Sequence, residues 1–256
     1  MTLKTKQFII RIPGSIAFYM FARKMRALPH FFKDFILFKK KDVSKRFSTK
    51  IIDFIPCLTD RTKTTSFEPH YTFHPPWAAR IIVENNPSKH IDISSIIHFS
   101  TMLSAYIPVD FYDYRPVNLF LPNLECKKGD LLALPFADNS IESISCMHTI
   151  EHIGLGRYGD TIDPEGDIKA INELKRVVRP GGTLIFVTPV GKPRIAFNAH
   201  RVYSYEQVIG MFVGMKLQEF SLVPDDYKKY GLMKGASKEI VKDQLYACGC
   251  FWFIKK

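Results

Sequence analysis

Cysteine is scarce in this sequence and follows no functional pattern. The 256 residues include five cysteines, which stand at Cys57, Cys126, Cys146, Cys248 and Cys250. No spacing matches the usual zinc, redox or disulfide motifs, and Cys248-Gly249-Cys250 is too short for them. We therefore expect a protein of the reducing cytoplasm, with no disulfide framework and no metal site.

Long apolar runs are also missing. The longest run, residues 16–22, ends in Arg23-Lys24 and is far shorter than the ~20 residues that span a bilayer. No small-residue cleavage site follows a signal-like stretch, and no repeat or low-complexity tract is present. These absences argue against a membrane-spanning protein, a secretory signal and a repeat architecture.

Acidic residues are nearly missing from the first 50 positions. This segment holds 13 Lys and Arg against Asp34 and Asp42, a net charge of +11, whereas the remaining 206 residues carry 23 basic and 23 acidic side chains. Aromatic residues interleave with the basic ones, as in helices that lie on anionic membranes. We expect either peripheral contact of residues 1–50 with the inner face of a membrane, or a helical cap on the main domain. Nucleic acid is an unlikely partner because no motif for it accompanies the charge.

The chain is expected to have two parts. Residues 1–70 form a basic, aromatic helical arm and linker, and residues 71–256 form the main domain. The linker is placed at residues 57–76 because this stretch is polar and contains proline. A helix over residues 77–84 leads into the domain.

The most informative segment is residues 141–191, which indicates strand, glycine-rich loop, helix, turn and strand. Residues 141–146 are a short apolar strand, and from Ile168 to Val178 the apolar residues recur at helical spacing. Pro180-Gly181-Gly182 is expected to stop this helix and reverse the chain before a strand at residues 183–187. Since ligands bind at the carboxyl ends of parallel strands, the loop after Cys146 is where a ligand is expected.

The rest of the domain alternates strands with helices. Further strands are predicted at residues 90–93, 109–112, 124–127, 216–222 and 245–254, and helices at residues 99–105 and 205–213. The total is seven strands. Such alternation predicts an α/β fold with a mostly parallel sheet.

Two motifs in this domain resemble a known family. The run from Glu151 to Asp160, EHIGLGRYGD, and the later FNAHR of residues 197–201 resemble the DUF268 family, within the class I S-adenosylmethionine-dependent methyltransferases. The resemblance covers roughly residues 71–256. It implies a Rossmann-like seven-stranded methyltransferase sheet with an antiparallel last strand, and S-adenosyl-L-methionine as cofactor.

The resemblance also implies a cofactor site along the first strands. Asp92 would orient the methionine end, and the family pattern has glycine where Ser94 stands, since a backbone that passes close to the ligand often adopts positive φ. Asp113, at the tip of the second strand, would accept hydrogen bonds from the ribose hydroxyls; Asp110 is the competing candidate. Asp130 would meet the adenine amino group. Leu131 and Met147 are further expected cofactor contacts.

The loops after the fourth and fifth strands supply the expected catalytic groups. His148, Glu151 and His152 form His-x-x-Glu-His, which also matches an inverted zinc-protease motif. That motif requires a helix, whereas these residues follow a strand and continue into a glycine-rich loop, so a zinc protease is not expected. His200 is the expected general base, with His148 and Glu151 in positioning roles. The expected acceptor contacts are Arg157, Tyr158, Asn198 and Arg201.

The glycines of residues 154–159 match GxGxxG, yet a dinucleotide site is not expected. The next strand ends in Val187-Thr188-Pro189 without the required acidic residue. We expect instead a methyltransferase that acts on a hydroxyl group. The candidate acceptor is a cell-surface sugar or its lipid-linked precursor in polysaccharide biosynthesis. The alternative is a non-catalytic protein of this fold that binds a partner or glycan at a membrane surface.

Overall fold

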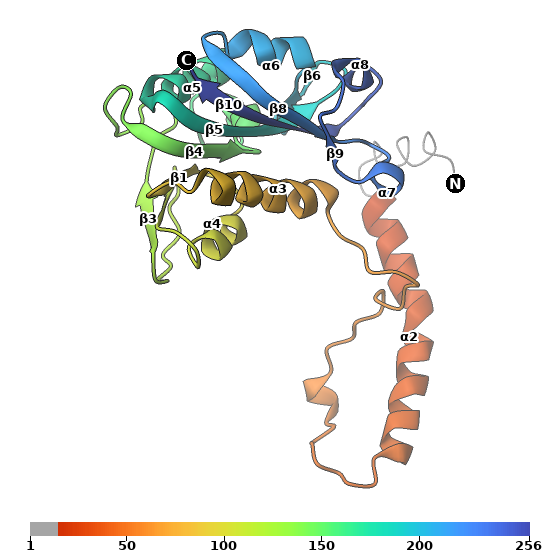
Figure 1. Ribbon diagram of the computed structural model, residues 1–256. Helices are drawn as coiled ribbons and strands as arrows, with labels where there is room; N and C mark the ends of the chain where they lie inside the picture. The colour runs from red at the N-terminus through yellow and green to blue at the C-terminus, as the bar shows by residue number, and fades with distance from the viewer. Residues whose placement is uncertain (1–14) are drawn as a thin grey trace. The chain divides into compact units, whose positions relative to one another are not determined.

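The computed structural model describes residues 15–256, and the chain divides into two compact units between Ser66 and Phe67. The first unit contains helix α2 (Ser15–Lys41) and the short 3-10 helix η1 (Ile51–Asp53) (Figure 1). Residues 42–50, predicted to be helical, are not, and residues 1–14 lie outside the described part of the chain.

Helix α2 leaves much of its apolar surface uncovered. Phe18 is 73% exposed and Phe38 56% exposed, while Phe31 and Phe35 pack edge-on against the ring of Phe54 at centroid distances of 5.4 and 4.6 Å. The last turn carries three consecutive lysines, residues 39–41, where the helix dipole favours positive charge. None of the helices in residues 15–256 has the length and apolar character needed to cross a membrane.

The second unit begins with helix α3 (Pro69–Asn85), which corrects the predicted linker over residues 69–76; residues 57–68 form neither helix nor strand. Pro69 occupies the first turn, where a missing N–H leaves no bond unmade, and the Glu68 carboxylate accepts a hydrogen bond from the Tyr71 N–H at 2.7 Å. Proline at residues 75 and 76 argued against a helix, because proline is unfavourable in a helix interior. Burial of Trp77 and Ile82 on the sheet favours the helix despite these prolines.

Eight strands form the central sheet, in the order β3-β2-β1-β4-β5-β10-β8-β9. They are β1 (His90–Ile93), β2 (Val109–Asp113), β3 (Leu124–Lys128), β4 (Ile141–Met147), β5 (Val178–Val190), β8 (Met215–Val223), β9 (Met233–Lys234) and β10 (Ala247–Lys255). The first five are parallel to one another, and β10 is antiparallel to both β5 and β8. The predicted α/β fold with an antiparallel last strand is therefore confirmed.

The predicted count of seven strands was short because the structure has additional small pairings. The two-residue strand β9 pairs with β8 at the sheet edge, and β6 (Arg194–Ala196) pairs with β7 (His200–Val202) in a separate two-stranded sheet. Strands of two or three residues are too short to show a hydrophobic period in a sequence.

The Pro180-Gly181-Gly182 segment does not form a separate turn. Helix α5 (Gly166–Val177) leads directly into β5, whose pairing with β4 jumps from Ile141↔Val178 to Ser143↔Thr183. The intervening residues thus form a bulge inside the strand, with Gly181 at φ +74°, a conformation that suits glycine.

Helices cover both faces of the sheet. On one face α5 and α6 (Tyr205–Met211) pack over β4, β5 and β10. On the other face α3 packs over β8 and β10, and α4 (Ile97–Leu103) packs over β2 (Figure 1). Two short helices, α7 (Tyr227–Tyr230) and α8 (Lys238–Val241), lie between β8 and β10 in sequence. This arrangement leaves the loops at the carboxyl ends of β1, β2 and β4 free to line a site.

Candidate functional site

Two cavities adjoin at the carboxyl ends of the parallel strands. The first, here called the carboxylate cavity, has a volume of about 230 Å³ and includes Asp113 and Asp130 in its wall. The second, the histidine cavity, measures about 610 Å³ and includes His70, Glu151 and His200. Residues common to both walls are Ser94, His148, His152 and Tyr158. A ligand in one cavity would therefore lie next to a ligand in the other.

The carboxylate cavity presents two acidic side chains on short turns. Asp113 Oδ1 accepts the Arg115 N–H at 2.7 Å, and Asp130 Oδ1 accepts the Leu132 N–H at 2.9 Å. Such turns fix each carboxylate to its own backbone, and within the described residues the second oxygen of each accepts no hydrogen bond. Both carboxylates can therefore accept hydrogen bonds from a ligand. Leu131 is buried in the same wall.

Ser94 has the backbone conformation expected at this position. Its φ is +53°, the left-handed region that a glycine would adopt at little cost, and its N–H and Oγ both donate to the Tyr112 carbonyl, at 2.8 and 3.2 Å. The serine side chain is thus accommodated at the boundary between the two cavities. Met147, expected beside the cofactor, lines the histidine cavity instead.

Asp92 does not reach either cavity, which corrects its expected role as a cofactor contact. It is fully buried in β1, where Ser100 and Ser145 donate hydrogen bonds to its two oxygens. Ser145 in turn bonds to His90 Nε2 at 2.9 Å. Burial raises the pKa of Asp92 to about 6 and lowers that of His90 to about 3. Asp92 is therefore part of an internal polar network. All four residues of β1 are buried, so this side chain does not reach solvent.

Asp110 and Asp113, the two candidates for the ribose contact, differ in whether they line a cavity. Asp110 is buried and forms ion pairs with Lys89 at 3.2 Å and Lys127 at 3.0 Å, and it lines neither cavity. Asp113 lies at the strand tip and lines the carboxylate cavity.

A buried histidine–carboxylate pair separates the cavities. His148 follows β4 with φ +57°, and its Nδ1 donates to Glu151 Oε1 at 2.8 Å. Glu151 is 1% exposed, and its Oε2 has no hydrogen-bond partner. The segment Ile150–His152 is a single 3-10 turn and His152 Nδ1 donates to the Ala199 carbonyl at 2.6 Å. The two histidines of the motif are thus used differently, which excludes the zinc-protease arrangement.

Helix α3 contributes a wall that sequence reasoning missed. The rings of His70 and His74 both lie 5.1 Å from the ring of His148, and Tyr71 lies 5.3 Å from it. Burial, followed by the neighbouring His148, lowers the pKa of His70 to about 4, and burial lowers the pKa of His74 as well. Both imidazoles are therefore neutral at pH 7. Their segment, HYTFH, falls in the predicted linker. Two histidines four residues apart, the spacing of one helix face, were the feature of the sequence that could have indicated a helix here.

The remaining predicted groups of the histidine cavity lie on its outer wall. His200 begins β7 and packs against the ring of Tyr246 at 4.8 Å, and burial lowers its pKa. Arg157 donates to the Ala199 carbonyl at 3.0 Å and lies 5.0 Å from the Tyr158 ring. These three side chains line the same cavity, and their roles stay predictions. Asp160 Oδ2 holds the glycine-rich loop by accepting the N–H groups of residues 154 and 156.

Two predicted acceptor contacts are wrong. Arg201 is 5% exposed and donates to the carbonyls of Ile153 and Pro164 at 2.6 and 3.2 Å, with Asp167 at 3.5 Å. It anchors the glycine-rich loop to α5, and it lines neither cavity. Asn198 is exposed at the β6–β7 turn and lines neither cavity. Asn198 stands in the turn between β6 and β7, whereas Arg201 lies within β7 and is buried.

Solved proteins share this architecture. The [4+2]-cyclase SpnF is 14% identical, with 71% of this chain and 79% of that chain covered and a TM-score of 0.50. YcgJ from Bacillus subtilis is 16% identical over 71% and 99% of the two chains, with a TM-score of 0.48. The N-methyltransferase NodS from Bradyrhizobium japonicum, solved with S-adenosyl-L-homocysteine, is 15% identical over 71% and 85%, with a TM-score of 0.49. The strand order and the similarity to SpnF confirm a Rossmann-like α/β fold, and they show the fold alone.

Part of the domain also matches a sequence family. Residues 135–236 match the family described as "Caenorhabditis protein of unknown function, DUF268", which confirms the resemblance seen in EHIGLGRYGD and FNAHR. No curated protein matches the chain.

Proposed function

We propose that this protein is an S-adenosylmethionine-dependent methyltransferase, with the cofactor in the carboxylate cavity and the methyl acceptor in the histidine cavity. The observation that carries this proposal is the shared wall of the two cavities, formed by residues 94, 148, 152 and 158. Methyl transfer needs the two reactants side by side, and holding them so is a large part of catalysis.

The residues of the carboxylate cavity fit the cofactor. Asp113 would hold the ribose hydroxyls and Asp130 the adenine amino group, since each keeps one carboxylate oxygen free. When bound, S-adenosylmethionine supplies an electrophilic methyl group on a sulfonium. The protein's own part is to position the acceptor and to remove its proton.

The proposed acceptor is a hydroxyl group, with His200 as the base. His200 is half-buried in the histidine cavity, and burial keeps its pKa below the ordinary value, so it is neutral and able to accept a proton at pH 7. Arg157 and Tyr158 line the same cavity and present hydrogen-bond donors to the acceptor. A sugar would supply both the hydroxyl and partners for these donors.

An apolar groove supports an acceptor linked to lipid. The groove has a volume of about 1010 Å³, lies between α3 and α4, and shares Tyr71 and Ile96 with the histidine cavity. Its other lining residues include Pro75, Ala79, Val83, Met102 and Tyr106. A hydrocarbon chain in this groove could extend its polar head group past Tyr71 and Ile96 into the histidine cavity.

The exposed aromatic residues of α2 and its terminal lysines support contact with an anionic membrane, where such an acceptor is found. Flotation with anionic liposomes at low and high salt tests this contact. The triple variant Lys39→Glu, Lys40→Glu, Lys41→Glu should lose the salt-sensitive fraction. Equal flotation of the variant and the wild type would exclude residues 39–41 from membrane binding.

A second candidate function is non-catalytic binding. Ser94 keeps a Cβ and a hydroxyl at a left-handed position beside the cavity, and SpnF, of the same fold, is described as a cyclase, so the fold does not fix the reaction. Calorimetry of the full chain with S-adenosyl-L-homocysteine decides between the two. Binding of this ligand supports the methyltransferase proposal. No binding heat and no thermal shift at millimolar ligand would instead favour non-catalytic binding.

A further inference from the structure

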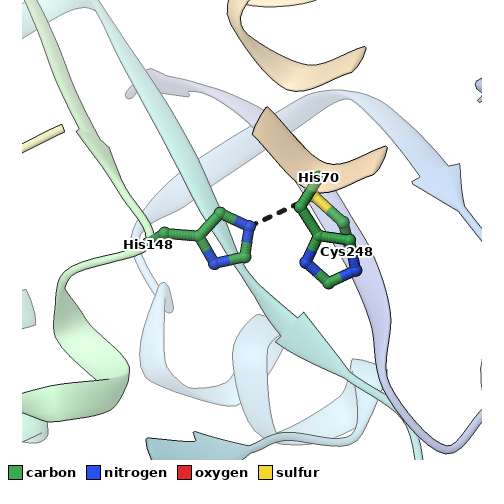
Figure 2. Close-up of side chains that lie close together, drawn as sticks. All are labelled: His70, His148 and Cys248. Carbon is green, nitrogen blue, oxygen red and sulfur yellow. Dashed lines mark hydrogen bonds between the residues drawn. The ribbon is translucent and has the colours of Figure 1, made fainter. Parts of the chain in front are cut away.

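The floor of the histidine cavity brings together three potential metal ligands from distant parts of the chain. His70 comes from the first turn of α3, His148 from the loop after β4, and Cys248 from β10; Figure 2 shows their side chains facing one another. One donor atom from each lies within 4.8 Å of the other two. All three residues are buried, Cys248 completely.

Hydrogen bonds prepare both imidazoles as ligands. Because His148 Nδ1 donates to Glu151, its Nε2 carries the lone pair, and this atom lies 3.5 Å from Cys248 Sγ. His70 Nε2 donates to the Tyr246 carbonyl at 3.2 Å, which leaves the lone pair on Nδ1. A ligating histidine commonly donates its other N–H to a carboxylate or carbonyl in this manner.

Two unsatisfied buried atoms adjoin the same group. Within residues 15–256, Glu151 Oε2 and His74 Nε2 have no hydrogen-bond partner. Glu151 is bonded to His148, and the His74 ring packs on the His148 ring at 5.1 Å. Since His74 Nδ1 donates to the His70 carbonyl at 2.7 Å, its Nε2 is a bare acceptor. Buried acceptors without donors are costly, and a cation or a metal-bound water would satisfy them.

We propose that His70, His148 and Cys248 bind one Zn²⁺-class ion at the floor of the histidine cavity, with Glu151 as the positioning carboxylate. Two nitrogens and one sulfur form a donor set that zinc prefers. Bond lengths near 2.0–2.1 Å to nitrogen and 2.3 Å to sulfur place tetrahedral N and S donors roughly 3.6 Å apart. The His148–Cys248 pair already has this separation.

His70 is the ligand that must move. Its ring is stacked on that of His148 with an interplanar angle of 15°, and two parallel rings cannot both direct in-plane lone pairs at one ion. For tetrahedral geometry the His70 ring would have to rotate out of the stack, so that the donor separations, now within 4.8 Å, fall to roughly 3.6 Å. The fourth position would then face the histidine cavity, which His70, His148 and Glu151 line. A hydroxyl or thiol of a bound molecule is the chemical class that this position accepts.

Cobalt titration of the full chain tests the site, because Co²⁺ bound to a thiolate gives a charge-transfer band in the near ultraviolet. The metal-stripped wild type should bind one Co²⁺ with this band, and one equivalent of Zn²⁺ should remove it. Cys248→Ser should lose the band. Cys250→Ser, the matched control two residues along β10 with its sulfur 3.7 Å from Cys248 Sγ, should keep it.

Glu151→Gln provides a second readout if Cys248→Ser does not unfold cooperatively. It should retain the thiolate band but weaken Co²⁺ affinity by about 10–100-fold, the usual effect of an outer-shell partner. A wild type without the band, a Cys248→Ser variant that keeps it, or an unchanged affinity in Glu151→Gln would each overturn the proposal. Titration of the metal-stripped protein with S-adenosyl-L-homocysteine is independent of this result, so the metal site and the methyltransferase proposal can fail separately.

Discussion

The two cavities share a wall but are held in different ways. In the carboxylate cavity, Asp113 and Asp130 are fixed by turns to the N–H groups two residues ahead, so their geometry is local. In the histidine cavity, His70, His148 and His200 come from α3, a loop after β4 and β7, and they are held by burial and by contacts over more than 45 residues of sequence. A change in the first cavity should therefore alter ligand affinity with little effect on folding, whereas the second couples chemistry to packing.

The largest expected effect separates chemistry from cofactor binding. With an acceptor that supports turnover, His200→Ala should lower kcat by roughly 10²–10⁴-fold, the contribution of a positioned general base, and leave S-adenosyl-L-homocysteine affinity within about twofold. The wild-type rate should also stay level as pH falls toward 6.5 and decline only below it, because burial lowers the pKa of His200 and the base must be neutral.

Steady-state kinetics and calorimetry on the same preparations measure the two quantities. His30→Ala, on an exposed histidine of α2, is the control and should match the wild type. Full turnover by His200→Ala would remove this residue from the mechanism. Loss of cooperative unfolding would instead show that His200 serves chiefly to pack against Tyr246.

A smaller effect is expected from Asp113, and it should appear in affinity. Asp113→Ala should raise the Kd for S-adenosyl-L-homocysteine by about 10–100-fold, as expected when hydrogen bonds to a charged acceptor are lost. The melting temperature without ligand should change little, since Asp113 makes a single hydrogen bond within its own turn. Calorimetry gives the affinity and a thermal melt gives the stability.

Asp113→Asn separates the turn from the charge, because the amide oxygen can still accept the Arg115 N–H. An intermediate Kd for Asn would support a charged contact with the ligand. If neither variant changed the affinity, the carboxylate cavity would not be where the nucleoside binds.

The smallest effect is expected at the shared wall. Ser94→Gly should tighten S-adenosyl-L-homocysteine binding by less than about 10-fold, because glycine adopts φ +53° without the strain of a side chain and removes a Cβ from the cavity edge. Calorimetry of Ser94→Gly beside Ser94→Ala distinguishes strain from the hydroxyl, which donates to Tyr112. Weaker binding in Ser94→Gly would mean that the serine contributes a contact rather than an obstacle.

The carboxylate cavity could be predicted from the sequence because its determinants are local. An acidic residue at the end of a β-branched or aromatic strand, as in Val109–Asp113, and a second one after Gly129 are visible as short patterns, and the strand tells where its tip lies. Strand position also separates Asp113, the last residue of β2, from Asp110, the second residue of the same strand, which is buried and paired with two lysines.

The alternation of strands with amphipathic helices was likewise sufficient for a mostly parallel sheet, because hydrophobic periodicity reports which face of each element is buried. The antiparallel last strand was expected only from the family resemblance. The same patterns could not show that Asp92 is sealed in the sheet or that Arg201 turns inward, since both depend on neighbours that are distant along the chain.

Tertiary structure alone placed His70 and His74 of α3 and Cys248 of β10 next to the predicted His148. His70 and His74 stand in a proline-containing stretch whose local pattern favours a loop, and they become part of a helix because Trp77 and Ile82 are buried against the sheet. In the sequence, Cys248 is one residue of a predicted apolar strand, and no motif marks it as a ligand. Only folding places it 3.5 Å from His148, one hundred residues earlier in the chain, because strand order in a sheet is set by packing between elements and not by the spacing of residues within them.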